Sequence, residues 1–299
     1  MNKLKHTIYT LLILLLVFQN AKAQLLPVDT VFNKKKLTAV VTVGSTVLVG
    51  TVVALNYAWY SDYPRSPWHG FNDNDEWLQM DKMGHLTTSY FLGKVGYDLL
   101  RWSGVSHEKS IWYGGSMGLV YLTSIEILDA FSTNWGFSWG DMAANTIGAG
   151  IYMGQAALWK EQRIAMKFSF HQTAYADIRP DLLGSNYLEN LIKDYNGQTY
   201  WASVNIYSFL KKESRFPKWL NVAVGYGAEG MVGSYYNPSN LPHFDRYRQY
   251  YLSLDIDFTR IPTKSKFLRT ILNGLSFIKF PMPTIEFSEK GAHFYPIYF

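Results

Sequence analysis

Residues 250–260 read YYLSLDIDFTR, and this stretch decides the fold class of the C-terminal half. Apolar residues at positions 252, 254, 256 and 258 alternate with polar residues at 253, 255, 257 and 259. A period of two is typical of a β-strand with one buried face. We therefore expect a strand whose leucines face a core. Asp255 and Asp257 would lie on the other face, toward water or a lumen.

Less regular alternation continues over the whole segment after residue 162. The strand candidates are residues 164–174, 199–210, 219–233, 250–260, 276–287 and 293–299, with a short helix at 185–194. Pro281 and Pro283 are expected to confine the fifth candidate to a sheet edge or to interrupt it, because proline cannot donate to a ladder. The aromatic end HFYPIYF resembles the last strand of outer-membrane barrels. A closed barrel takes at least about eight strands, so the sequence predicts a partial sheet or a barrel-like sheet of about six strands.

The region between residues 37 and 159 has helical character. Apolar helices are expected at 37–60, 85–102, 110–131 and 141–159, with Asp141 as the cap or first residue of the last one. Short connections between them favour an antiparallel bundle. Gly148, Gly150 and Gly154 would let a neighbouring backbone lie close to the last helix. The chain is therefore expected to be an α+β protein, a bundle of about four helices followed by the β-rich half.

The first of these helices, LTAVVTVGSTVLVGTVVALNYAWY at 37–60, contains no charged residue and follows three lysines. It is long enough to cross a bilayer, and Gly44 and Gly50 suit close packing of helices in a membrane. A central helix in the core of a water-soluble domain would have the same length and composition. Both interpretations stay open at the level of sequence.

The N-terminal segment MNKLKHTIYTLLILLLVFQNAKAQ has the layout of a secretory signal peptide. A basic start precedes an apolar core and the small-residue cleavage site AKA. We expect residues 1–23 to be the signal peptide, residues 24–162 the helical domain and residues 163–299 the β-rich domain. Because the sequence contains no cysteine, it offers neither a disulfide nor a cysteine that could carry a lipid.

Composition favours a membrane environment. Aromatic residues make up 17% of the chain and charged residues also 17%, whereas soluble domains carry about a quarter charged residues. Tyrosine and tryptophan favour the boundary between lipid and water, so membrane lipid is the expected partner. The sequence contains no arginine-rich run that would indicate binding of nucleic acid. It does not identify a cofactor or a protein partner. The absence of Gly-x-Ser-x-Gly, Walker, His-Glu-x-x-His and Rossmann motifs excludes the best-marked serine hydrolases, nucleotide enzymes and zincins.

Polar residues within the apolar helices are few, and they mark the candidate site. The catalytic candidates are His85, Glu126 and Asp141, and the further binding candidates are Asp81, Asp129, Ser138 and Asn145. Residues three or four apart on a helix share a face, as Asp81 and His85 do. Carboxylates and an imidazole that face one interior could form a metal site or an acid–base pair. A helix cap, or a polar network that fixes helix register, is the alternative.

The order of these residues resembles two known families. The blocks Asp81-Lys82-x-x-His85, helical Glu126 and Gly136-x-Ser138-x-x-Asp141-x-x-x-Asn145-x-x-Gly148 are similar to those of the YfiM-type predicted periplasmic proteins, a domain of unknown function. The same order resembles, more loosely, the VanZ-like membrane proteins associated with glycopeptide resistance. The similarity spans roughly residues 75–157. It implies a location in the cell envelope and no established reaction.

The whole chain departs from both families. YfiM-type proteins are often lipoproteins, whereas this sequence has no cysteine, and VanZ-like proteins lack a β-rich half such as 163–299. The combination resembles longer envelope proteins of Bacteroidetes-type bacteria. This resemblance implies that the protein lies in the outer membrane or in a membrane that faces the periplasm.

Two hypotheses about function follow. The first is an accessory or structural envelope protein, exported and membrane-associated, with the Asp/His/Glu/Asp set as its polar core. The second is a membrane-embedded enzyme, with or without a metal ion, that acts on a lipid or a lipid-linked glycan. In such an enzyme, His85 would act as a general base or as a metal ligand. Glu126 and Asp141 would act as general acids or as metal ligands. A channel or transporter fits less well, because the strands are too few for a pore.

Overall fold

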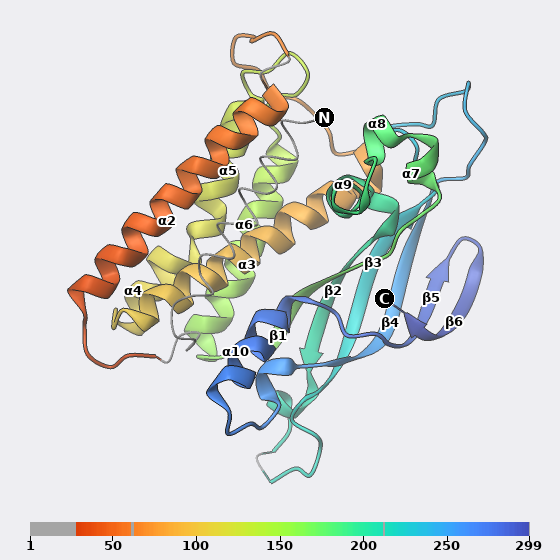
Figure 1. Cartoon of the computed structure of the whole chain (residues 1–299). Helices are drawn as coiled ribbons and strands as arrows, with labels where there is room; N and C mark the ends of the chain where they lie inside the picture. Colours follow the sequence, from red (N-terminus) through yellow and green to blue (C-terminus); the bar gives the residue numbers. More distant parts are fainter. Residues whose placement is uncertain (1–27, 61–62, 212, 299) are drawn as a thin grey trace. The chain divides into compact units, whose positions relative to one another are not determined.

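The computed structural model describes residues 28–60, 63–211 and 213–298, so the expected signal peptide at 1–23 lies outside the described residues. The chain divides into two compact units (Figure 1). The helical unit comprises the residues up to 73, 88–160 and 265–270, and the strand-containing unit comprises 74–87, 161–264 and 271–299. Helices dominate the N-terminal half and an open antiparallel sheet follows, which confirms the expected α+β class.

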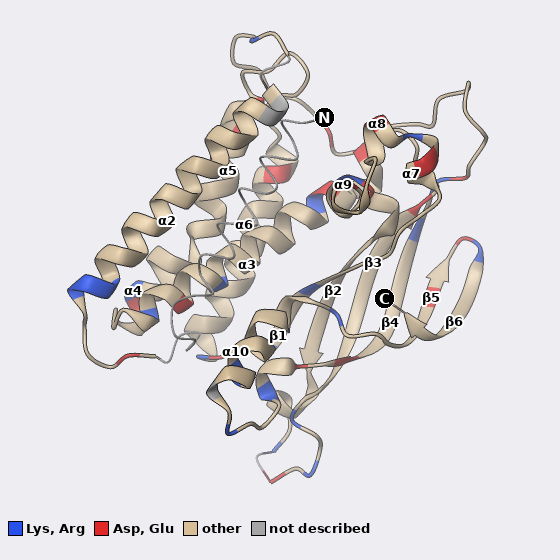
Figure 2. Ribbon diagram, viewed as in Figure 1, with Lys and Arg blue, Asp and Glu red and all other residues tan. Residues whose placement is uncertain are grey.

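The helical unit begins with α2, Lys34–Leu55, which continues as a π-helical turn, Asn56–Tyr60. Helix α2 is long and apolar enough to cross a membrane, yet none of its residues is buried by the described part of the chain. Figure 2 shows that α2 carries no charge beyond its basic start. Its interpretation as a buried core helix is therefore wrong. An added Cβ at Gly44 or Gly50 would meet nothing within 4 Å, so these glycines do not mark a close helix contact here.

The other helices of the N-terminal half are α3, Met80–Trp102, α4, His107–Lys109, α5, Met117–Asp129, and α6, Trp139–Leu158. A π-helical segment, Ser110–Gly114, precedes α5, so the continuous helix expected at 110–131 is interrupted. Helix α3 starts five residues earlier than expected, so the candidate pair at 81 and 85 lies within its first two turns.

Close backbone packing in the helical unit occurs at glycines other than the expected ones. A Cβ added to Gly93 of α3 would lie 2.5 Å from the Gly115 carbonyl, and one added to Gly118 of α5 would lie 2.7 Å from Ser89 Cα. By contrast, a Cβ added to Gly150 or Gly154 of α6 would meet nothing within 4 Å. The expectation of a neighbouring backbone beside these two positions is therefore wrong.

The strands are β1, Ile164–Phe170, β2, Gln198–Asn205, β3, Leu220–Glu229, β4, Tyr247–Ile256, β5, Met282–Ser288, and β6, Gly291–Tyr298. They form one antiparallel sheet in sequence order, β1-β2-β3-β4-β5-β6 (Figure 1). Three short helices separate β1 from β2: α7, Tyr175–Ile178, α8, Pro180–Leu183, and α9, Tyr187–Lys193. Helix α10, Lys266–Gly274, precedes β5. The six expected strands are present with shifted bounds: β2, β4 and β6 begin earlier than expected, and β5 begins later.

The expected effect of proline on the fifth strand is confirmed in part: β5 begins only at Met282 and its pairing is interrupted at Pro283, but β5 is not an edge strand. β5 pairs with β4 on one side and with β6 on the other, although Pro283 lies inside it. The pairing with β6 shifts register between Met282 and Thr284, and Pro283 falls in this irregularity. The missing N–H is tolerated there because a bulge already interrupts the ladder. The Pro283 carbonyl accepts a hydrogen bond from the Ser253 hydroxyl at 3.2 Å.

The two faces of β4 are the reverse of the expected ones. Tyr251, Ser253 and Asp255 are buried. Leu252 and Leu254, which were expected to face a core, are 45% and 40% exposed. The alternation of the sequence is thus preserved, with the polar residues inside and the apolar residues outside.

Curvature of the sheet accounts for this reversal. The Tyr298 hydroxyl of β6 lies 3.1 Å from the Thr199 hydroxyl of β2 and donates to the Tyr251 hydroxyl of β4 at 2.8 Å. The polar face therefore lines the inside of the curve, where Asp255 is shielded from water. Asp257 lies beyond the end of β4 and pairs with Arg260 at 3.1 Å, so the two aspartates do not share a strand face.

The outer face of β2 and β3 is covered in part, although Val224 of β3 is 55% exposed. Met80, at the start of α3, packs with Tyr200, Ala228 and Met231 in a hydrophobic cluster of the strand-containing unit. On β4 and β5 the outward residues are exposed: Tyr250, Leu252, Leu254, Ile285 and Phe287. We call these five residues the outer apolar patch.

Candidate functional site

Ser138, and not Asp141, caps the start of α6. Its hydroxyl accepts a hydrogen bond from the Asp141 N–H at 3.0 Å, which satisfies one of the donors that a helix start leaves without a helical partner. Asp141 is thus the third residue of the helix, where the helix dipole favours its carboxylate. Both residues are buried, at 2% and 4% exposure, whereas Trp139 between them is 71% exposed.

Two further carboxylates bind Ser138. Its N–H donates to Glu126 Oε2 at 3.1 Å, and its hydroxyl donates to Asp73 Oδ1 at 2.6 Å. Glu126 is buried, and the structure therefore ties this predicted catalytic candidate to the start of α6. Asp73 is not among the predicted site residues, because its partner Ser138 lies 65 residues away along the chain.

Helices α3 and α6 lie side by side within the helical unit. The Ser89 hydroxyl donates to the Asn145 carbonyl at 2.7 Å. About two turns further along both helices, the ring of Tyr97 packs against that of Tyr152 with centroids 5.8 Å apart. The contacting faces of the two helices therefore run in the same direction, and residues at equal steps from Ser89 and Asn145 come together.

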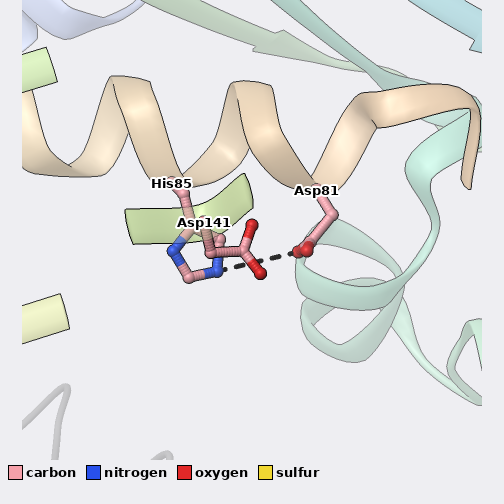
Figure 3. Close-up of side chains that lie close together, drawn as sticks. All are labelled: Asp81, His85 and Asp141. Carbon is pink, nitrogen blue, oxygen red and sulfur yellow. Dashed lines mark ion pairs between the residues drawn. The ribbon is translucent and has the colours of Figure 1, made fainter. Parts of the chain in front are cut away.

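Asp81, His85 and Asp141 lie close together (Figure 3). On the continuous helix α3, His85 precedes Ser89 by one turn, as Asp141 precedes Asn145 on α6. One ligand atom from each of the three residues lies within 4.8 Å of the other two. His85 Nε2 and Asp81 Oδ1, four residues apart on one helix face, are 3.9 Å apart. The structure thus brings together three of the predicted site residues.

Residues of the strand-containing unit hold Asp81 in place. The Tyr195 hydroxyl donates to Asp81 Oδ1 at 2.8 Å, and Lys82 Nζ lies 3.3 Å from Asp81 Oδ2. Tyr195 follows α9, 114 residues along the chain from Asp81. Tyr195 is not among the predicted site residues, because no periodic pattern connects residues so far apart.

A left-handed turn sets the point at which α3 begins. Trp77, Leu78 and Gln79 have φ angles of 48°, 50° and 66°. Such angles cost roughly 1–2 kcal/mol for each residue that is not glycine. Hydrogen bonds from other segments offset this cost: the Trp77 N–H donates to the Ser234 carbonyl at 2.8 Å, and the Tyr226 hydroxyl donates to the Leu78 carbonyl. The surrounding structure therefore holds the first turns of α3, which carry the site, in a defined position.

The remaining binding candidates have partners of their own. The Tyr60 hydroxyl donates to Asp129 Oδ1 at 2.6 Å, and burial together with the Asp129 charge raises the pKa of Tyr60. Asn145 is fully buried on α6, where its carbonyl accepts the bond from Ser89. These contacts explain both residues as parts of the helix packing.

A second buried cluster, on the inner face of the sheet, was not predicted. Lys167 Nζ lies 2.7 Å from Asp255 Oδ2, and both side chains are at most 2% exposed. The Ser203 hydroxyl donates to the same carboxylate oxygen at 2.6 Å, and the Phe280 N–H donates to the other at 3.2 Å. Lys279, also buried, donates to the Phe280 carbonyl at 2.8 Å. Two cations and one anion are therefore enclosed here.

We expect the free energy of unfolding of the wild type to increase with pH between pH 7 and 9.5. Lys279→Met is expected to abolish this increase. Burial, reinforced by the Lys167 charge and opposed by Asp255, lowers the pKa of Lys279 from 10.5 to about 8. Between these values the unfolded chain binds more protons than the folded chain, so the free energy of unfolding increases with pH. The increase is at most about 2 kcal/mol over the 1.5 pH units from 8 to 9.5. Equilibrium urea unfolding at several pH values measures it. Equal pH profiles for wild type and Lys279→Met would contradict the assignment.

Comparison with known proteins places the candidate site in a family segment. Residues 68–156 match the model of a family described as "Predicted periplasmic lipoprotein (DUF2279)". The match covers less than a third of the 299 residues, and it includes every predicted site residue from Asp81 to Asn145. No curated protein and no solved structure matches the chain. This segment is thus similar to a periplasmic family of unknown function, in agreement with the expected export to the cell envelope.

Proposed function

We propose that this protein is an exported, accessory envelope protein that associates with membrane lipid through the outer apolar patch and α2. The reversed polarity of the sheet carries the proposal. On β5, Thr284 and Glu286 are buried, whereas Ile285 and Phe287 are 38% and 48% exposed. A sheet whose outer face meets water would expose the polar residues and bury the apolar ones.

The register of the sheet makes the outer apolar patch continuous. Leu252 is directly opposite Ile285, and Tyr250 is directly opposite Phe287. None of the five patch residues is charged, and two are aromatic, a composition that suits the boundary between lipid and water. Continuous apolar patches on a protein surface mark interaction sites. The low share of charged residues in the whole chain favours lipid as the partner.

Helix α2 supports the same proposal. It spans 22 residues, which corresponds to about 33 Å and so to the thickness of a bilayer core. Its exposed valines would lose contact with water in lipid, and each valine buried there contributes of the order of 1–2 kcal/mol.

Single cysteines test the outer apolar patch, because the sequence contains no cysteine of its own. We expect an environment-sensitive fluorophore on Leu254→Cys to shift to the blue when the full chain is reconstituted in lipid vesicles. We also expect a lipid-borne nitroxide to quench it and aqueous iodide to leave it unaffected. The matched control is Ser239→Cys, in an exposed segment between β3 and β4, which should respond in the opposite way.

Two outcomes speak against membrane association. One is equal quenching of both labels by iodide in vesicles, which would leave the patch in water. The other is protection of the Leu254→Cys label in lipid-free solution at high protein concentration, which would assign the patch to contact between copies of the chain. Recovery of the protein in the soluble periplasmic fraction would independently exclude a stable membrane association.

A membrane-embedded enzyme that acts on a lipid or a lipid-linked glycan is the second candidate. The proximity of His85 to two carboxylates favours it, because an imidazole and a carboxylic acid together provide a base and an acid. This candidate differs from the first in requiring turnover. A modified lipid or glycan must form with the wild-type chain and must not form with His85→Gln.

A further inference from the structure

We propose that Asp81, His85 and Asp141 bind one divalent transition-metal ion of the zinc type. This inference rests on the geometry of these three side chains and does not depend on membrane association. The three supply one imidazole nitrogen and two carboxylates, and a ligand atom from each lies within 4.8 Å of the others (Figure 3). Ligands bound to one ion at about 2.0–2.2 Å are separated by less than about 4.4 Å, so only small side-chain shifts are needed.

The chemistry of the ligands selects the class of ion. Imidazole nitrogen together with carboxylate oxygen suits zinc and similar first-row ions. Calcium and magnesium prefer sites made of oxygen alone, which makes them weaker candidates. The chain has no cysteine, so thiolate ligation plays no part. Three protein ligands would leave a fourth position for water or for another ligand.

Charge provides a second reason. Asp81 and Asp141 are brought within 4.8 Å of one another, and Asp141 is only 4% exposed. Two ionised carboxylates this close repel each other, and the repulsion grows as water is excluded. Lys82 offsets part of the charge of Asp81 at 3.3 Å. A divalent cation between the carboxylates would offset the charge of both.

The surrounding residues hold the ligands in position before an ion binds. The Tyr195 hydroxyl fixes Asp81, and the Ser138 hydroxyl fixes the backbone of Asp141. The bond from Ser89 to the Asn145 carbonyl aligns the two helices one turn away. Such outer contacts orient metal ligands, and their loss typically weakens metal affinity by about 10–100-fold.

A titration of the full chain, stripped of metal with a chelator and solubilised in detergent, with Zn²⁺ alone tests the proposal. We expect one equivalent to bind. His85→Gln and Asp141→Asn should each weaken the affinity by about 100-fold or more, since a ligand contributes more than its outer partner. Tyr195→Phe should weaken it by about 10-fold. The matched control is His243→Gln, which removes a His–Asp pair with Asp245 whose side chains are 91% and 79% exposed.

The proposal is overturned if wild type binds no Zn²⁺, or if folded His85→Gln binds it with unchanged affinity. It is also overturned if His243→Gln removes the bound equivalent. Should both ligand variants fail to fold, the Co²⁺ absorption spectrum of the His243→Gln chain decides. A visible spectrum typical of Co²⁺ bound by nitrogen and oxygen ligands would support the site. A spectrum identical to that of hydrated Co²⁺ would exclude it. The accessibility of the label on Leu254→Cys tests membrane association and does not depend on metal binding. Failure of one proposal can therefore be distinguished from failure of the other.

Discussion

Asp255→Ala is expected to lower the free energy of unfolding by about 3–5 kcal/mol, the cost of breaking a buried ion pair by removing one partner. The variant would leave the Lys167 ammonium enclosed in the sheet without its carboxylate, which now lies 2.7 Å away. It would also remove the acceptor for the Ser203 hydroxyl. Equilibrium urea unfolding of the full chain, followed by tryptophan fluorescence, measures the loss.

The matched control is Asp181→Ala, which removes an ion pair to Arg179 with a 73% exposed carboxylate. Exposed pairs contribute at most about 1 kcal/mol, so this variant should change stability little. The double variant Lys167→Met/Asp255→Leu should recover much of the loss, because it leaves no unpaired charge in the sheet. A similar effect of Asp255→Ala and Asp181→Ala would show that the interior of the sheet is well hydrated.

Gly118→Val is expected to lower the free energy of unfolding by about 3 kcal/mol, since overpacking a tight helix contact costs roughly 1–3 kcal/mol or more. A Cβ at position 118 would lie 2.7 Å from Ser89 Cα, and backbone atoms cannot move aside as a flexible side chain does. Helix α5 would have to shift away from α3. Thermal unfolding followed by circular dichroism measures the effect.

Gly150→Ala is the matched control for a glycine within a helix. An added Cβ there would meet nothing within 4 Å, and alanine favours a helix over glycine by roughly 0.5–1 kcal/mol. This variant should therefore unfold at the same or a slightly higher temperature. If Gly118→Val unfolded at the same temperature as Gly150→Ala, the contact between α3 and α5 would tolerate a larger spacing.

Much of the fold could be predicted because periodicity depends only on neighbouring residues. Alternation at 250–260 predicts a strand, and the structure contains strand β4 at Tyr247–Ile256. The same alternation says nothing about which face is inside, because both faces of a strand have a period of two. The usual assumption that leucine faces the core reversed the assignment of Leu252 and Asp255. The curvature that encloses Asp255 depends on contacts between β2, β4 and β6, which no local pattern contains.

The candidate site was predictable to a similar extent. Spacings of four residues identify Asp81 with His85, and Asp141 with Asn145, as residues that share a helix face. The proximity of His85 to Asp141 depends on the relative alignment of two helices, set by Ser89. Tyr195 comes from a distant segment, and a single residue without a repeat leaves no signal in one sequence.

The left-handed turn at 77–79 has a consequence for shortening the chain. The segment that matches the family model ends at residue 156, but the groups that hold this turn, such as Tyr226 and the Ser234 carbonyl, come later in the sequence. A truncated protein that ended at residue 156 would keep the complete family segment and lose these anchors. It would also lose Tyr195, the partner of Asp81. In this protein the segment that matches the family model therefore depends on contacts from residues that follow it in the sequence.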